Sequence, residues 1–183
     1  MTTPLKVLVF AASNSSASIN KMLVTHAANV FKGEIASGAE ITILDINDFE
    51  MPIYSMDREN AGGIPELAHA FFSAIGDSDA LMISYAEHNG SYSAAFKNIF
   101  DWCSRINSKV YQDKPMVIMS TSPGPSGAAS VLKMATDSAG FFAADLRGSL
   151  SVPNFNDNFD AEKGQLTNAE LAAELRNQLA KLV

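Results

Sequence analysis

The sequence contains a single cysteine, Cys103, among its 183 residues, so no disulfide can form within the chain. It contains no apolar run of about 18 residues, the length that a membrane-spanning helix needs. Its first residues lack the basic start and the small-residue cleavage site of a signal peptide. These absences predict a cytoplasmic protein that does not associate with membranes.

Positive charge is also scarce. The chain has 13 Lys and Arg against 20 Asp and Glu, which gives a net charge of −7. No basic stripe is visible, and this argues against a nucleic-acid partner. Hydrophobic residues make up 47% and charged residues 18%, an ordinary globular balance. Because no linker, repeat or low-complexity segment divides the chain, we expect one domain over residues 1–183.

Several catalytic motifs are missing. No Gly-x-Ser-x-Gly elbow is present, and no Gly-x-Gly-x-x-Gly fingerprint follows the first apolar run, which argues against a hydrolase and a classical dehydrogenase. The acidic residues of a phospho-receiver are absent from the ends of the first and third apolar runs. We predict no metal site and no essential catalytic acid, base or nucleophile.

Apolar runs and helical patterns alternate along the chain. The runs that predict strands are Leu5–Phe10, Glu40–Leu44, Ala80–Tyr85, Met116–Ser120 and Ala143–Val152. Gly33 is the expected stop of the first helix, and Thr167 begins a capping-box pattern for the last. The alternation predicts an α/β three-layer, flavodoxin-like fold. Its five-stranded parallel sheet would have the order 2-1-3-4-5, with helices on both faces. Two long connections, Asn47–Ile64 and Pro153–Gln165, are interpreted as loops.

Three polar loops follow the first, third and fourth predicted strands, at residues 11–20, 86–92 and 120–127. In the expected order these strands are neighbours, so the loops would surround one cleft at the carboxyl edge of the sheet. The first loop holds four serines and two asparagines at a helix N-terminus, a setting that suits a phosphate monoester. The second loop suits a flat, hydrogen-bonding ring. A phosphate pocket beside a ring-sized slot points to flavin mononucleotide (FMN).

The same loops carry a family resemblance. Ala12 to Asn20 resembles a Gly-Ser-x-Arg-x-x-Ser-x-Asn motif. Ala86–Ser91 with Lys97–Trp102 resembles Pro-Glu-Tyr-Asn-Gly-Ser followed by Lys-Asn-x-x-Asp-Trp, and Ser120–Gly127 resembles Ser-x-Ser-Pro-Gly-x-x-Gly. In order and spacing over nearly the whole chain, the sequence is similar to the NADPH-dependent FMN reductases, which include quinone, chromate and azo-dye reductases.

The resemblance implies FMN and NAD(P)H as cofactors and assigns the cofactor-binding residues by loop. On the first loop these are Ser13, Ser15, Ser18, Ile19 and Asn20, near the phosphate. On the second, along the edge of the isoalloxazine ring, they are Ala86, Glu87, His88, Asn89 and Gly90. On the third they are Ser122 and Gly124. The resemblance also implies a homodimer or homotetramer.

Four positions depart from the family motifs. Ser15 stands at the arginine, Ala12 at the glycine, Ala86 at the proline and His88 at the tyrosine. Without the arginine the phosphate lacks its usual fixed cation, and a charge-assisted contact is about twice as strong as a neutral one. Lys21 is close in sequence, but its helical phase could point it away from the loop.

Three functions remain open at this point. The first is an FMN-dependent reductase that passes hydride from NAD(P)H through flavin N5 to a small flat acceptor, such as a quinone, an azo compound, free flavin or a metal oxyanion. The second is a flavodoxin-type electron carrier, which the acidic charge fits. The third is a binding module that has lost flavin, which the exchange at Ser15 suggests.

Overall fold

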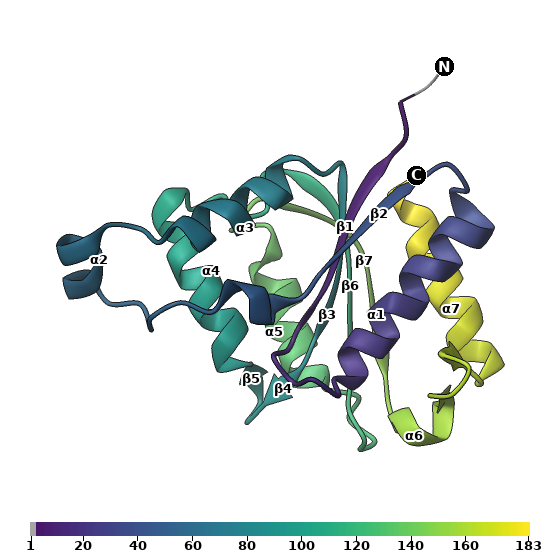
Figure 1. The fold of residues 1–183 in the computed structure, drawn as a ribbon. Helices are drawn as coiled ribbons and strands as arrows, with labels where there is room; N and C mark the ends of the chain where they lie inside the picture. The colour runs from purple at the N-terminus through teal and green to yellow at the C-terminus, as the bar shows by residue number, and fades with distance from the viewer. Residues whose placement is uncertain (1–2) are drawn as a thin grey trace.

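The computed structural model describes residues 3–183. Five parallel strands form one sheet in the order β2-β1-β3-β6-β7 (Figure 1). The strands are β1 (Lys6–Ala12), β2 (Glu40–Leu44), β3 (Ala80–Tyr85), β6 (Lys114–Thr121) and β7 (Ala144–Val152). Counted along the chain this is the order 2-1-3-4-5, so the predicted flavodoxin-like sheet is confirmed.

The two central strands are the most apolar. Every residue of β3 is buried, and in β1 only Lys6 is exposed. The β1–β3 ladder continues to the pairs Ala11↔Ser84 and Ala12↔Tyr85, so β1 extends two residues beyond the predicted end at Phe10. The first polar loop therefore starts at Ser13.

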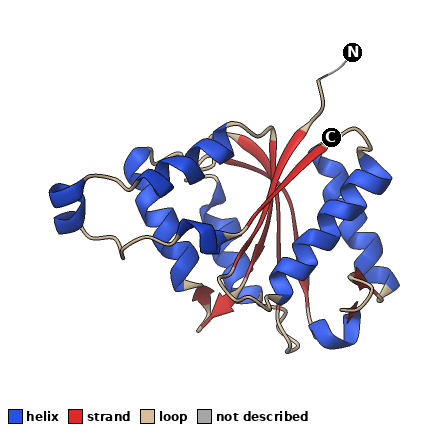
Figure 2. Ribbon diagram, viewed as in Figure 1, coloured by secondary structure: helices blue, strands red, loops and turns tan. Residues whose placement is uncertain are grey.

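Helices cover both faces of this sheet (Figures 1 and 2). On one face lie α3 (Glu66–Gly76), α4 (Ala94–Ile106) and α5 (Ala129–Ala139), which share one core cluster. On the other lie α1 (Ile19–Val30) and α7 (Ala169–Leu179), which share a second. Within residues 3–183, no helix has the length and apolar character needed to span a bilayer.

Two predicted helix ends are wrong. Gly33 does not stop the first helix, because the chain continues as a π-helical turn (η1, Phe31–Ile35) closed by a 2.8 Å bond from Ala36 N–H to the Phe31 carbonyl. The cap of α7 is Asn168 rather than Thr167. Its Oδ1 accepts the N–H groups of the first turn at 3.1 Å, whereas the Thr167 N–H donates to the Asn158 carbonyl. A short 3₁₀ turn, η3 (Ala180–Leu182), follows α7.

Both long connections contain secondary structure and are not simple loops. The first holds a 3₁₀ turn, η2 (Ile46–Phe49), and the helix α2 (Met56–Gly62), which Ser55 caps by accepting the Arg58 N–H at 3.2 Å. The second holds α6 (Phe155–Asn158) and a hairpin of β8 (Phe159–Asp160) and β9 (Gln165–Leu166). Buried Phe155 and Phe159 stack there at 4.6 Å and join this polar segment to the core cluster under α1.

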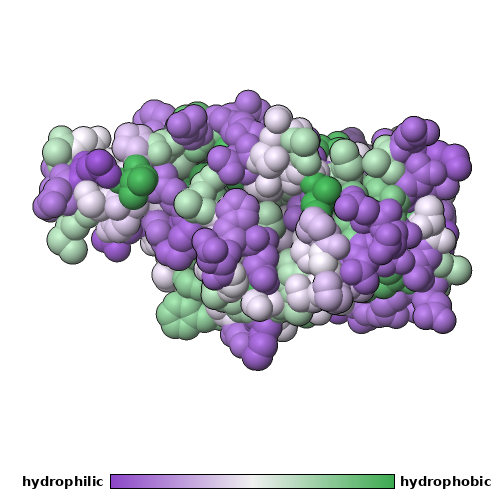
Figure 3. Space-filling view, turned by 90° about the horizontal axis from the view of Figure 1, so that it is seen from below, coloured by the Kyte–Doolittle hydropathy of each residue, from purple (hydrophilic) through white to green (hydrophobic). Residues whose placement is uncertain are grey.

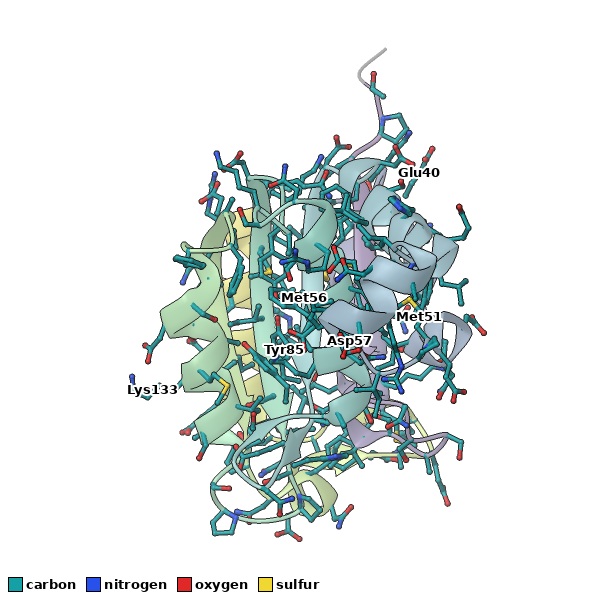
Figure 4. All side chains as sticks on the ribbon, turned by 90° about the vertical axis from the view of Figure 1, so that its left-hand side faces the viewer. Glu40, Met51, Met56, Asp57, Tyr85 and Lys133 are labelled. Atoms are coloured by element: carbon teal, nitrogen blue, oxygen red, sulfur yellow. The ribbon has the colours of Figure 1, made fainter. Side chains whose placement is uncertain are left out.

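Residues 50–64 project from the body as an arm with α2 at its tip (Figure 1), and Figure 4 views this arm from its tip. Its base is fixed to α4: Asn98 donates to the Met51 carbonyl at 3.0 Å and accepts the Tyr54 N–H at 2.8 Å. The indole N–H of Trp102 donates to the Pro52 carbonyl at 2.8 Å. The Asn98 and Trp102 of the second sequence motif therefore hold the arm in place.

Candidate functional site

The loops that follow β1, β3 and β6 lie together at the carboxyl edge of the sheet, the face shown in Figure 3. They comprise residues 13–18, the short hairpin of β4 (Glu87–His88) and β5 (Ser91–Tyr92), and residues 122–128. The Ser93 hydroxyl donates to the Ala12 carbonyl at 2.9 Å, which ties the hairpin's exit to the end of β1. The structure therefore brings the three predicted loops to one place.

The first loop leads into α1 with unused backbone donors. Ser18 caps the helix by accepting the Lys21 N–H at 3.2 Å, and Ser13 Oγ accepts the Ser15 N–H at 3.3 Å. No described residue accepts the N–H groups of Ser16 or Ala17. Ser13 and Ser18 are mostly buried, whereas Ser15 is exposed. Exposed N–H groups at the positive end of a 12-residue helix fit a phosphate group.

Asn20 occupies a different position from these serines. Its side chain is 3% exposed and points into the protein, where Oδ1 accepts the Ser84 hydroxyl at 2.7 Å and the Thr121 N–H at 3.1 Å. Its Nδ2 donates to the Thr121 carbonyl at 3.3 Å. One amide therefore joins the start of α1 to the ends of β3 and β6. Ile19, beside it, packs against the core cluster under α1.

The second loop is a tight hairpin, which the sequence analysis did not predict. Asn89 and Gly90 adopt φ values of 53° and 77°, the left-handed pair that a two-residue hairpin turn requires. The turn and His88 are exposed, while Ala86 at the end of β3 is buried. Tyr92 packs on buried Tyr85 at 5.4 Å, and burial raises the pKa of both phenols.

Glu87 has a structural contact that sequence reasoning missed. Its Oε2 accepts the Val131 N–H at 2.9 Å, in the first turn of α5. The residue at the N-cap position of that helix, Ala128, has no side-chain oxygen and adopts a left-handed conformation. Glu87 therefore caps α5 from another part of the chain. Because its carboxylate is used in this way, mainly the backbone of Glu87 is available to bind a ligand at the carboxyl edge of the sheet.

The third loop is held by carbonyl contacts. The Gly127 carbonyl accepts the hydroxyls of Ser120 at 2.7 Å and Ser151 at 2.9 Å. The Ser122 carbonyl accepts the Phe155 N–H at 3.0 Å. The Ser122 hydroxyl turns back to the Gly124 carbonyl at 3.2 Å, and a Cβ at Gly124 would meet no atom within 4 Å. These contacts join the loop to β7 and α6, and they leave open space over Gly124.

The charged pair nearest the first loop is Lys21 and Asp45, whose charged atoms lie 2.5 Å apart. The hydrogen bond from Lys21 lowers the pKa of Asp45 below its usual value, with a further contribution from Asn47. This lysine thus already has a carboxylate partner.

A pocket of about 430 Å³ adjoins the loops without containing most of them. Asn14 of the first loop lines it, together with Phe49, Tyr54 and the first turn of α4. Its walls are largely apolar, and the base of the arm forms one side. A ligand on the loops would therefore have a second, less polar space beside it.

Comparison with known proteins agrees with this geometry. Residues 5–157 match the sequence profile of the family described as NADPH-dependent FMN reductase. An Arabidopsis thaliana NADPH:quinone oxidoreductase is 32% identical over 126 residues, which cover 69% of this chain and 62% of that protein. A Burkholderia 2-hydroxy-1,4-benzoquinone reductase is 34% identical, covering 68% and 64%. The match thus spans less than two thirds of either relative.

Solved structures share the fold over nearly the whole chain. FerB from Paracoccus denitrificans, a flavoenzyme NAD(P)H:(acceptor) oxidoreductase, superposes with a TM-score of 0.78 at 24% identity, covering 97% of this chain and 94% of that one. A Bacillus anthracis FMN-dependent NADH-azoreductase, solved with FMN, gives 0.65 at 12% identity, covering 97% and 99%. Since the family profile spans most of the sequence, this chain is a member of the NADPH-dependent FMN reductase family.

Proposed function

We propose that the protein binds FMN and acts as an NAD(P)H-dependent reductase of small flat acceptors. The observation that supports this most strongly is the meeting of three elements at one sheet edge: the α1 N-terminus, the Asn89-Gly90 turn and the open loop at Gly124. The names of the two relatives described above support a quinone as the acceptor. The experiment described below determines whether the protein prefers NADH or NADPH.

In this proposal the first loop binds the phosphate through Ser13, Ser15 and Ser18 and through free backbone N–H groups. Asn20 and Ile19 hold that loop in position. The hairpin from Ala86 to Gly90 follows the edge of the flavin ring, and Ser122 and Gly124 lie on its other side. When bound, FMN would supply the hydride chemistry, because its N5 would accept a hydride from the nicotinamide and pass it on to the acceptor.

The residues at the carboxyl edge of the sheet would then bind and orient the flavin ring, and they would leave one side of the ring open. The space over Gly124 is open, and the largely apolar pocket beside Asn14 offers a place for an acceptor's ring. No side chain in the proposed site needs to transfer a proton. His88 is exposed on the hairpin, at the position where the family motif has tyrosine.

The deciding experiment is the visible spectrum of the purified protein, titrated with FMN and then mixed anaerobically with NADPH or NADH. We expect a bound-flavin spectrum that bleaches within seconds with one nicotinamide and recovers on addition of a benzoquinone. Bound flavin that does not bleach would identify an electron carrier. Protein that binds no flavin would identify a binding module.

We also propose that the protein is a homodimer joined through the arm. No residue of α2 is buried, and Ile53 and Met56 are 74% and 66% exposed. The arm is nonetheless braced, since the Tyr54 hydroxyl and Arg105 Nε both donate to Glu59 Oε2, at 3.1 and 2.9 Å. A braced projection that exposes two large apolar side chains is suited to an isologous contact with a second copy.

Sedimentation analysis tests this contact. We expect the wild-type chain to sediment as a dimer and the variant Ile53→Asp/Met56→Asp as a monomer, because two carboxylates would be buried unpaired in the interface. Phe141→Asp is the matched control, since Phe141 is 79% exposed and lies between α5 and β7, outside the arm. A monomeric wild type, or dissociation by the control alone, would exclude the arm as the contact.

A further inference from the structure

The first loop contains no positively charged side chain to balance the phosphate group that we propose it binds. A phosphate monoester carries close to two negative charges at neutral pH. The loop offers hydroxyls and N–H groups, and Ser15 provides no positive charge where the family motif has arginine. Because charge-assisted contacts are about twice as strong as neutral ones, tight binding of FMN through this loop calls for a cation from another position.

Lys21 is placed to supply that cation. It is the third residue of α1 after the Ser18 cap, and side chains in the first turn of a helix lean back toward its N-terminus. Ser16, Ser18 and Lys21 line the same surface hollow of about 300 Å³. The lysine side chain and the end of the first loop therefore border the same hollow.

The present partner of Lys21 is easily exchanged. The side chains of Lys21 and Asp45 are 43% and 33% exposed, and pairs this exposed contribute little stability. Lys21 contacts Oδ2, whereas Asn47 donates twice to Oδ1, from its backbone N–H at 3.0 Å and its Nδ2 at 2.8 Å. If Lys21 moves away, Asp45 keeps both Asn47 bonds and access to water. No buried charge is left unpaired by the exchange.

We infer that Lys21 is the specificity-determining cation for the FMN phosphate, and that it exchanges Asp45 for the phosphate when FMN binds. Asp45 then competes with the phosphate for the lysine. This inference rests on the proposed function, because it concerns the phosphate of the same flavin. It predicts effects of opposite sign for the two members of one ion pair, which a purely structural salt bridge would not produce.

The test compares dissociation constants of FMN and riboflavin, which lacks the phosphate, in five variants. We expect Lys21→Gln to weaken FMN binding about tenfold, the effect of one lost charge-assisted bond, and riboflavin binding less than about twofold. Lys21→Arg should retain most of the FMN affinity. Asp45→Asn should tighten FMN binding several-fold, and this gain should disappear in Lys21→Gln/Asp45→Asn. Lys163→Gln, which removes another lysine of the same hollow, is the control and should have little effect.

Equal losses for FMN and riboflavin in Lys21→Gln would overturn the inference, because the lysine would then act through the fold. An equal effect of Lys163→Gln would overturn it as well, since any nearby charge would suffice. So would a gain for Asp45→Asn that persists without Lys21, because simple repulsion by Asp45 would explain it. A wild-type chain that binds neither flavin would refute the proposed function itself, a result distinct from all of these.

Discussion

Replacement of Asn20 by alanine is expected to lower the free energy of unfolding by about 3–5 kcal/mol, because a buried polar group left without its partner costs about 1–3 kcal/mol. The substitution removes three hydrogen bonds together, to the Ser84 hydroxyl and to the N–H and carbonyl of Thr121. It also frees the start of α1 from the ends of β3 and β6. We therefore expect FMN affinity to fall with stability, although the Asn20 amide faces the protein interior.

Urea unfolding of the flavin-free protein measures this effect, with Asn14→Ala as the matched control. Asn14 lies on the same loop but is exposed, so its replacement should change stability by less than about 0.5 kcal/mol. A loss below about 1 kcal/mol for Asn20→Ala would mean that water enters and satisfies Ser84 and Thr121.

The second large effect is expected at Gly127. Its φ of +59° costs a residue with a side chain about 1–2 kcal/mol, and a Cβ there would approach the Pro153 nitrogen to 2.9 Å as well as the Ser151 hydroxyl. Because Pro153 presents backbone, which cannot rotate away, we expect Gly127→Ala to cost about 3 kcal/mol or more. The third loop should lose its fixed shape at the same time.

Gly124→Ala provides the comparison, since a Cβ at Gly124 meets no atom within 4 Å. Thermal unfolding should separate the two variants clearly, with Gly124→Ala close to the wild type. Equal melting temperatures for both would show that the connection between β6 and α5 yields to the added methyl group, and that the loop is softer than its hydrogen bonds indicate.

The sheet could be predicted from the sequence because its signals are local. The predicted bounds of β2 and β3 agree with the structure, since each apolar run ends at a charged or small residue. The first strand was predicted two residues too short because Ala11 and Ala12 have no strong β propensity, and only their pairing with β3 extends it. The alternation of strands and helices predicted a parallel sheet, and the strand order 2-1-3-4-5 was chosen as the topology that best suits a chain of this length.

The site was only partly predictable for a related reason. Composition pointed to the three loops, but the partner of each side chain depends on residues distant in sequence. Asn20 has the type of a phosphate ligand, yet it bonds a segment 101 residues away. Glu87 is similarly occupied with a helix 44 residues later. The Asn-Gly pair at 89–90, between Glu87-His88 and Ser91-Tyr92, was a usable local signal for the hairpin that the sequence analysis did not apply.

The contact between Glu87 and Val131 couples two parts of the molecule thermodynamically. The first turn of α5 depends on the hairpin for its cap, so fraying of that helix and displacement of the hairpin are linked equilibria. Linkage is reciprocal: a molecule that orders the hairpin also stabilises the start of α5, and by the same free energy. The outer surface of α5, where Lys133 lies (Figure 4), thereby becomes sensitive to events at the carboxyl edge of the sheet.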